Sequence, residues 1–176
     1  MTFYFDVYCN NYEIIISKNF IINNINYNIF DWNDLNDEYY LANLVFPEYK
    51  SSNNNTGNIW QTLKLRPFKI CPCKYEQLIT WSNNSIINII VRDDDGKIIG
   101  FCVISDMVEF YFINILCTNI SQGIGTLIIE FIQKFIIVNK PIKLEATFNS
   151  KKFYLKKGFV KINDDIMEYS SKKIDY

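Results

Sequence analysis

Two glycines that follow an apolar stretch are the residues of this chain that most clearly indicate a ligand-binding site. In the segment from Val108 to Thr126, apolar residues lead into Gln122-Gly123-Ile124-Gly125-Thr126, which opens a helical pattern. Glycines let the backbone approach a bound group closely, and the free N–H groups and positive dipole end of a helix start attract phosphate. The segment therefore predicts a site for a phosphorylated ligand.

Two common phosphate-binding motifs do not fit this turn. A Walker loop requires a lysine after its last glycine, and none follows Gly125. A dinucleotide-binding fingerprint requires a third small residue, where this chain has Ile128, and a parallel strand–helix–strand unit. Here the turn comes late in the chain, after a pattern typical of an antiparallel hairpin.

Residue periodicity predicts the elements around the turn. Alternating apolar and polar residues predict strands in the first thirty residues, around Phe3–Val7, Tyr12–Ile16 and Ile25–Ile29. Apolar residues on one face predict a helix over 33–46, the polar run 51–58 is a loop, and further helical stretches fall at 60–67 and 75–81. The later pattern predicts a hairpin (86–91 and 97–104), a strand (109–115), a helix (about 126–138), a strand (143–146), a helix (150–156) and a strand (166–169).

Composition narrows the class of protein. With 176 residues, 49% hydrophobic and 21% charged, we expect one globular domain over 1–176. A net charge of −1 gives no reason to expect nucleic acid or an anionic membrane as partner. The amino end lacks the pattern of a signal peptide, and no apolar stretch is long enough to cross a bilayer.

The residues available for catalysis or metal binding are limited. The chain has no histidine, which excludes histidine-dependent nucleophilic machinery and histidine-ligated metals. Its five cysteines, none spaced as Cys-x-x-Cys, are interpreted as free thiols in a reducing, cytoplasmic setting. Cys117 is interpreted as a passive thiol and not as a nucleophile, because no histidine or clear base accompanies it. Asp93-Asp94-Asp95-Gly96 is typical of a hairpin turn rather than of a calcium site, so no metal is expected.

A second motif joins the glycine turn. Together with Phe153-Tyr154-Leu155-Lys156-Lys157-Gly158-Phe159, the turn makes residues from about Ile86 to Tyr169 resemble the GNAT superfamily of N-acetyltransferases. The resemblance implies an α/β fold with a mixed, mostly antiparallel, twisted sheet flanked by helices. It implies transfer of acetyl from acetyl-CoA to a primary amine by direct attack, with a small-molecule or protein acceptor. The alternative is a module that binds coenzyme A or a partner without efficient transfer, and a third possibility is a purely structural interaction module. The N-terminal strands (1–30) would extend the sheet or pair in a homodimer.

The resemblance also assigns cofactor contacts. Main-chain groups of Ile113, Asn114 and Ile115 would bind the pantetheine arm and thioester carbonyl. The pyrophosphate would lie on the turn formed by Ser121, Gln122, Gly123, Ile124, Gly125 and Thr126. The family commonly has Arg or Gln where this chain has Ile120, which implies weaker binding. Asn149 or Thr147 would contact the cofactor, although Asn149 also suits a helix N-cap.

Two residues take catalytic roles by the same resemblance. Tyr154 would be the general acid that protonates the departing thiolate, its alternative role being to pack a helix beside Phe153. Glu109 would be the base, on the same strand as Ile115 and an even number of residues before it, unless a bulge breaks that parity. Otherwise Glu109 only ends a strand in solvent. Asp106 and Glu145 are the other candidate bases.

Overall fold

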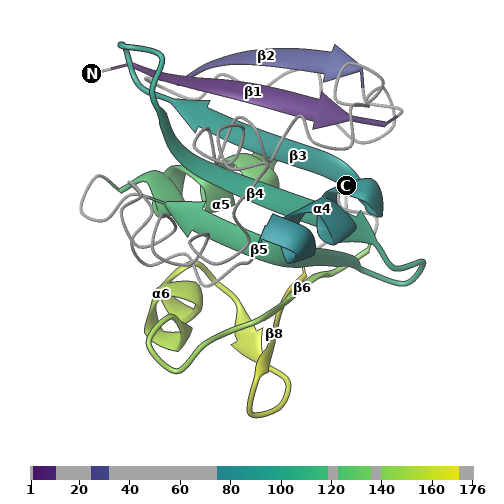
Figure 1. Cartoon of the computed structure of the whole chain (residues 1–176). Coiled ribbons are helices and arrows are strands. Elements are labelled where there is room, and N and C mark those ends of the chain that lie inside the picture. Colours follow the sequence, from purple (N-terminus) through teal and green to yellow (C-terminus); the bar gives the residue numbers. More distant parts are fainter. Residues whose placement is uncertain (1, 11–24, 32–74, 119–122, 136–139, 171–176) are drawn as a thin grey trace, which may run out of the picture.

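The computed structural model describes residues 2–10, 25–31, 75–118, 123–135 and 140–170 of the chain. Its helices are α4 (Tyr75–Asn83), α5 (Ile124–Phe135) and α6 (Lys151–Lys156). Its strands are β1 (Phe3–Cys9), β2 (Ile25–Asp31), β3 (Ser85–Arg92), β4 (Ile98–Asp106), β5 (Tyr111–Thr118), β6 (Ile142–Glu145), β7 (Val160–Lys161) and β8 (Ile166–Tyr169), all shown in Figure 1.

The described strands form one sheet with the order β2-β1-β3-β4-β5-β6-β8-β7. Neighbouring strands are antiparallel except for two pairs, β1 with β2 and β5 with β6. The prediction of an α/β fold with a mixed, mostly antiparallel sheet is therefore confirmed.

The N-terminal strands extend this sheet. β1 lies antiparallel to β3, with Val7 opposite Ile89, and β2 lies parallel to β1 with Ile25 opposite Phe3. The strand predicted at 12–16, the helix predicted at 33–46 and the stretches at 51–58 and 60–67 lie outside the described residues.

The predicted hairpin is present as β3 and β4. Its turn is shaped by Asp93, whose Oδ1 accepts the N–H groups of Asp95 at 3.1 Å and Lys97 at 2.9 Å. Gly96 supplies the left-handed conformation that closes the turn, with φ +77°. The first aspartate thus serves the turn itself, in agreement with the interpretation of this segment as a hairpin turn.

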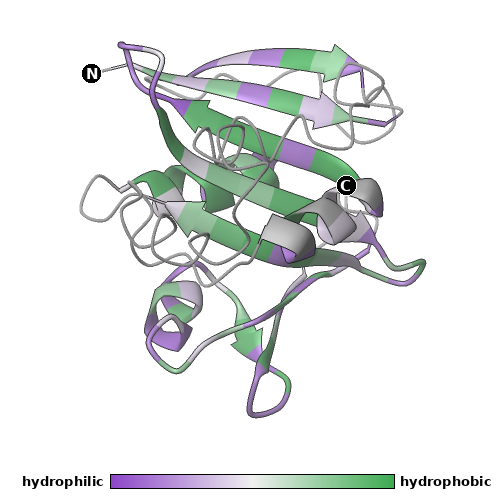
Figure 2. Cartoon of the chain, in the orientation of Figure 1, coloured by the Kyte–Doolittle hydropathy of each residue, from purple (hydrophilic) through white to green (hydrophobic). Residues whose placement is uncertain are grey.

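Helices lie on both faces of the sheet. α5 packs behind β4 and β5, and α4 lies in front of β3 and β4 (Figure 1). The apolar stripe of α5, which includes Ile128, Phe131 and Ile132, is buried against the sheet. Figure 2 shows the apolar character of the central strands. In the described part of the chain no helix has the length and apolarity needed to cross a membrane.

The predicted bounds of β5 and the predicted start of α5 differ from the structure. β5 runs from Tyr111 to Thr118, so it starts and ends later than the strand predicted at 109–115. α5 starts at Ile124 instead of about 126, which places Gly125 and Thr126 inside its first turn.

Candidate active site

β5 loses its neighbour on one side partway along its length. β6 pairs with it at only three positions, Tyr111 with Ile142, Phe112 with Lys143, and Ile113 with Leu144. Beyond Ile113, none of the described strands pairs with β5 on that side. Main-chain N–H and C=O groups at such an unpaired edge are available to a ligand.

A β-bulge lies at the same point. On the other side of β5, Ile113 is opposite Ile104 and Ile115 is opposite Val103, so Asn114 has no partner in the ladder with β4. Asn114 follows the last residue paired with β6, and it is therefore left out of both ladders. The predicted thioester-binding residues, Ile113 to Ile115, span this irregularity.

The predicted phosphate site falls at the start of α5. Gly123 has φ +71°, and its carbonyl accepts the N–H of Leu127 at 3.2 Å. The N–H groups of Ile124, Gly125 and Thr126 come before this first intrahelical bond and have no intrahelical acceptor. They stand at the positive end of the helix dipole, which favours an anion. Ile120, Ser121 and Gln122 lie outside the described residues.

Gly100 holds this helix start close to the sheet. It lies in β4 opposite Thr118, and a Cβ on Gly100 would lie 2.9 Å from the Cγ2 of Ile124. Only glycine allows the first turn of α5 to approach β4 so closely. Sequence reasoning missed Gly100, because a glycine inside an apolar strand indicates that another element packs closely on it but does not show which element that is.

Gly125 connects three parts of the site. A Cβ on this residue would lie 3.5 Å from the ring of Phe153, 3.7 Å from Leu116 and 3.9 Å from Thr118. The start of α5, the far half of β5 and helix α6 therefore meet around Gly125. The two motifs that carried the sequence prediction are brought together in space.

Tyr154 projects from α6 into the core. Its side chain is only 7% exposed, and its ring packs against the rings of Phe153 and Phe159, with centroids 5.0 and 5.5 Å away. Burial raises the pKa of the Tyr154 phenol well above its usual value, and the nearby Cys102 thiol adds to the effect. The phenol therefore stays protonated at neutral pH, as a proton donor must.

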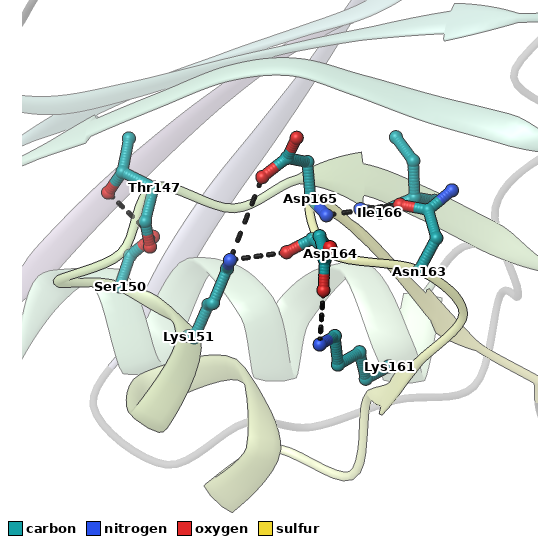
Figure 3. A network of polar contacts seen from close by, with 8 residues as sticks. All are labelled: Thr147, Ser150, Lys151, Lys161, Asn163, Asp164, Asp165 and Ile166. Atoms are coloured by element: carbon teal, nitrogen blue, oxygen red, sulfur yellow. Dashed lines mark hydrogen bonds and ion pairs between the residues drawn. The ribbon is translucent and has the colours of Figure 1, made fainter.

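The segment between β6 and α6 differs from one prediction. The N-cap of α6 is Ser150, not Asn149, so the capping alternative for Asn149 is wrong. The Thr147 hydroxyl lies 3.0 Å from the Ser150 hydroxyl, and the Thr147 carbonyl accepts the N–H groups of Ser150 and Lys151 (Figure 3). Asn149 is exposed, and its side chain remains available for the predicted cofactor contact.

Polar contacts tie α6 to the end of the sheet. Lys151 donates to the carbonyl of Asp164 and lies 3.7 Å from Asp165, while Lys161 pairs with Asp164 at 2.8 Å (Figure 3). After the helix, Gly158 adopts the predicted left-handed conformation with φ +84°, and Phe159 is in the core as predicted. The contacts of Lys151 thus join the start of α6 to the loop before β8.

Glu109 is not on β5. It is exposed, in the turn between β4 and β5, where its N–H donates to the carbonyl of Met107 at 2.7 Å. The parity argument that linked it to Ile115 is wrong for two reasons, since Glu109 precedes the strand and the bulge at Asn114 breaks the alternation. At about 3.3 Å per residue, Glu109 lies up to roughly 13 Å along the chain from Ile113.

The other two candidate bases differ from each other. Asp106 pairs with Lys140, and its Oδ1 also accepts the N–H of Val108, so it is committed to the turn. Glu145 is the last residue of β6, next to the Leu144 that pairs with Ile113, and it is exposed. In the described ranges no lysine or arginine forms an ion pair with Glu145.

The expectation that all five cysteines are free thiols is wrong, as Cys117 shows. Cys9 and Cys102 are free and buried, whereas Cys117 of β5 is disulfide-bonded. A disulfide removes the thiol, so Cys117 cannot act as the nucleophile that sequence reasoning had weighed and disfavoured.

In this sheet the bulged strand β5 stops pairing with its parallel neighbour β6, and the glycine-containing start of α5 lies beside β5. This arrangement is that of an acyl-CoA N-acyltransferase fold. A family model described as an acetyltransferase (GNAT) domain matches residues 71–175. The chain belongs to the GNAT family of acetyltransferases. The matched range includes the whole segment, 86–169, that carried the resemblance. A single domain over 1–176 stays a prediction.

Comparison with individual proteins finds solved structures of low sequence identity. No curated protein matches the sequence. An acyl-CoA N-acyltransferase structure from Pseudomonas aeruginosa is 15% identical, over 48% of this chain and 68% of that one, with a TM-score of 0.41. The ribosomal-protein-S18-alanine N-acetyltransferase of Escherichia coli is 13% identical, over 60% and 83%, with a TM-score of 0.45. A GNAT family acetyltransferase from Streptococcus pneumoniae is 24% identical, over 48% and 68%, with a TM-score of 0.40.

Proposed function

We propose that this protein transfers the acetyl group of acetyl-CoA to a primary amine by direct attack. The observation that carries the proposal is the bulge at Asn114, located where β5 stops pairing with β6. The anion-binding start of α5 and the protonated phenol of Tyr154 are both joined to this strand through Gly125 and Phe153. The same strand can thus hold a thioester between a phosphate site and an acid.

The steps of acetyl transfer determine the role that we propose for each residue. N–H groups of residues 113–115 bind the thioester carbonyl, and one such donor on the developing oxyanion is worth about 3 kcal/mol. The amine nitrogen attacks the carbonyl carbon, and a carboxylate accepts the proton that the nitrogen must lose. When the C–S bond breaks, Tyr154 donates its proton to the thiolate of coenzyme A. Gly123 to Thr126, with Ser121 and Gln122, bind the pyrophosphate, and Asn149 contacts the same ligand.

Two carboxylates compete for the role of base. Glu109 is the residue favoured by the family resemblance, and in this role it acts on the amine directly or through one bridging water. Glu145 stands beside Leu144, at the point where the strands part, and is the second candidate. Replacing each by glutamine separates them, because the amide keeps the size of the side chain and loses the basic oxygen.

The test measures release of free thiol from acetyl-CoA with a panel of ethanolamine, glucosamine, spermidine, tyramine and a peptide with a free amino terminus. We expect turnover with at least one amine, and a decrease of about 100-fold or more when the base is removed by Glu109→Gln or Glu145→Gln. Equal activity of both variants and wild type would eliminate both residues as bases.

The alternative function, a coenzyme A-binding module without efficient transfer, gives a different result. It predicts thermal stabilisation by coenzyme A, since a ligand that binds only the folded state raises its stability, but no thiol release with any amine. Absence of both stabilisation and thiol release contradicts the enzyme and the binding module alike.

A further inference from the structure

The side chain of the bulged residue has a fixed position. Asn114 is the only polar residue between Tyr111 and Cys117, and its Nδ2 donates to the Oγ of Ser105 at 2.6 Å. Ser105 lies near the end of β4 and is 7% exposed. Because the Nδ2 is engaged, the amide carbonyl Oδ1 is directed away from Ser105. In the described part of the chain no donor occupies this oxygen.

The pair faces away from α5 and α6. Ile104 and Ile113 are opposite each other and belong to the core that includes α5, Tyr154 and Phe159. Ser105 follows Ile104, so its side chain lies on the opposite face of the sheet, and Asn114 contacts it there. The face toward α5 is filled by buried side chains at this point. Asn114 therefore presents its side chain on the face opposite α5, beside the bulge at which we propose that the thioester binds.

Glu145 lies on that same face. Ile142 and Leu144 belong to the core on the α5 side, which by alternation places Glu145 on the other side of β6. Leu144 is opposite Ile113, and each strand continues by one residue to Glu145 and Asn114. These two polar side chains flank the place where β5 and β6 part.

We propose that the Oδ1 of Asn114 binds an N–H of the attacking amine and that Ser105 positions Asn114 for this contact. The inference rests on the proposed function. A neutral primary amine has two N–H groups and one lone pair. After the lone pair forms the N–C bond, the nitrogen carries a positive charge and both hydrogens. One proton passes to the base, and the other stays hydrogen-bonded to Asn114 until the C–S bond breaks.

This arrangement specifies the class of acceptor. A secondary amine has a single N–H, which must be given up to the base, so that Asn114 is left without a donor when the amide product forms. An unpaired polar group at a binding site costs affinity. The site thus selects primary amines, and the selection resides in the Asn114 side chain rather than in the main-chain contacts to the thioester.

The experiment compares wild type with Asn114→Ala, Ser105→Ala and Ser105→Thr. Its probes are the fastest primary amine of the panel and the N-methyl derivative of that amine. For the primary amine we expect kcat/KM to fall about tenfold in both alanine variants, the equivalent of one hydrogen bond, with the N-methyl amine much less affected. Ser105→Thr recovers the loss because it keeps the hydroxyl. The Kd of coenzyme A, measured by calorimetry, stays within about twofold of wild type.

Ser85→Ala is the matched control. Ser85 is also buried, stands opposite Ser105 on β3, and donates to the carbonyl of Ser82 at 2.8 Å instead of contacting Asn114. It should lose stability without changing the preference for primary amines. If Asn114→Ala keeps the wild-type preference, or if both amines lose activity equally, the inference is wrong while the proposed function stands. If wild type acetylates no amine, both are wrong.

Discussion

Replacing Gly100 of β4 by alanine should displace the start of α5 and so weaken binding at the proposed phosphate site. The new Cβ would lie 2.9 Å from the Cγ2 of Ile124 and 3.3 Å from the Cδ1 of Ile128. Ile124 is 1% exposed and is the first residue of α5. Its methyl group branches at Cβ and cannot turn away freely, so relief of the contact requires the helix start to move away from β4.

The expected magnitude combines two opposing effects. Overpacking a core costs about 1–3 kcal/mol. Alanine also restricts the unfolded chain, which offsets about 0.4–1 kcal/mol of that cost. We therefore expect Gly100→Ala to lower the free energy of unfolding by about 1–2 kcal/mol and Tm by roughly 2–8 °C. Because the N–H groups of α5 move with the helix, coenzyme A should bind about tenfold more weakly.

The assay is urea denaturation of the ligand-free protein, followed by calorimetry with coenzyme A. Gly125→Ala is the control for packing, since its Cβ meets no atom closer than 3.5 Å and its ligand-free stability should change by less than about 0.5 kcal/mol. In the double variant Gly100→Ala/Ile124→Ala the clash is removed. The stability loss of the double variant should therefore be smaller, by at least about 0.5 kcal/mol, than the sum of the losses of the two single variants. Additive losses, or wild-type stability of Gly100→Ala, would refute the reasoning.

Three further predictions concern the turn, the acid and the contact between helices. Val108 has φ +65° at an exposed turn, so Val108→Asn should raise the free energy of unfolding by about 1 kcal/mol in urea denaturation, and a loss of stability would contradict this strain. Burial raises the pKa of the Tyr154 phenol, so the contribution of the protonated phenol to stability is complete below the ordinary tyrosine pKa of about 10 and is lost as the pH rises above it. Above a pH of about 10, the free energy of unfolding of wild type should therefore fall more steeply with pH than that of Tyr154→Phe. Tyr154→Phe should also lower turnover with little change in the Kd of coenzyme A, and unchanged turnover would remove Tyr154 from the mechanism. Gln133 donates to the carbonyl of Lys157 at 2.7 Å, so Gln133→Ala should cost about 1 kcal/mol in the same denaturation assay, and no cost would show that water replaces the bond.

Local patterns predicted most of the elements in the second half of the chain. The hairpin of β3 and β4 was evident because branched apolar runs flank a turn rich in Asp and Gly, and each of these signals acts over a few residues. The start of α5 was evident for the same reason, since glycine, helix periodicity and the preceding apolar strand are all local. The two motifs met around Gly125 as the family resemblance implied.

Features that depend on pairing between strands were not predictable. The bulge at Asn114 adds one residue to β5 relative to β4, and period-two alternation cannot show which strand carries the extra residue. That shift removed the argument for Glu109. The position of Glu145 beside the Leu144–Ile113 pair depends instead on the register of β6 with β5, which the sequence pattern does not show. The parallel pairing of β2 with β1 and the contact of Gly100 with Ile124 likewise depend on partners distant in sequence.

The pairing of β1 with β3 also sets an order of events during folding. Cys9 is opposite Ile87, so most of the first half of the chain must be closed into a loop before these strands meet, whereas β3 and β4 are joined by one tight turn. Long-range pairing is slower because the entropy of loop closure is lost before any contact forms. On the ribosome, β1 emerges long before β3 has been made. Apolar residues such as Phe5 and Val7, which are buried in the folded protein, then remain uncovered, and this exposes the N-terminal strands to aggregation during synthesis.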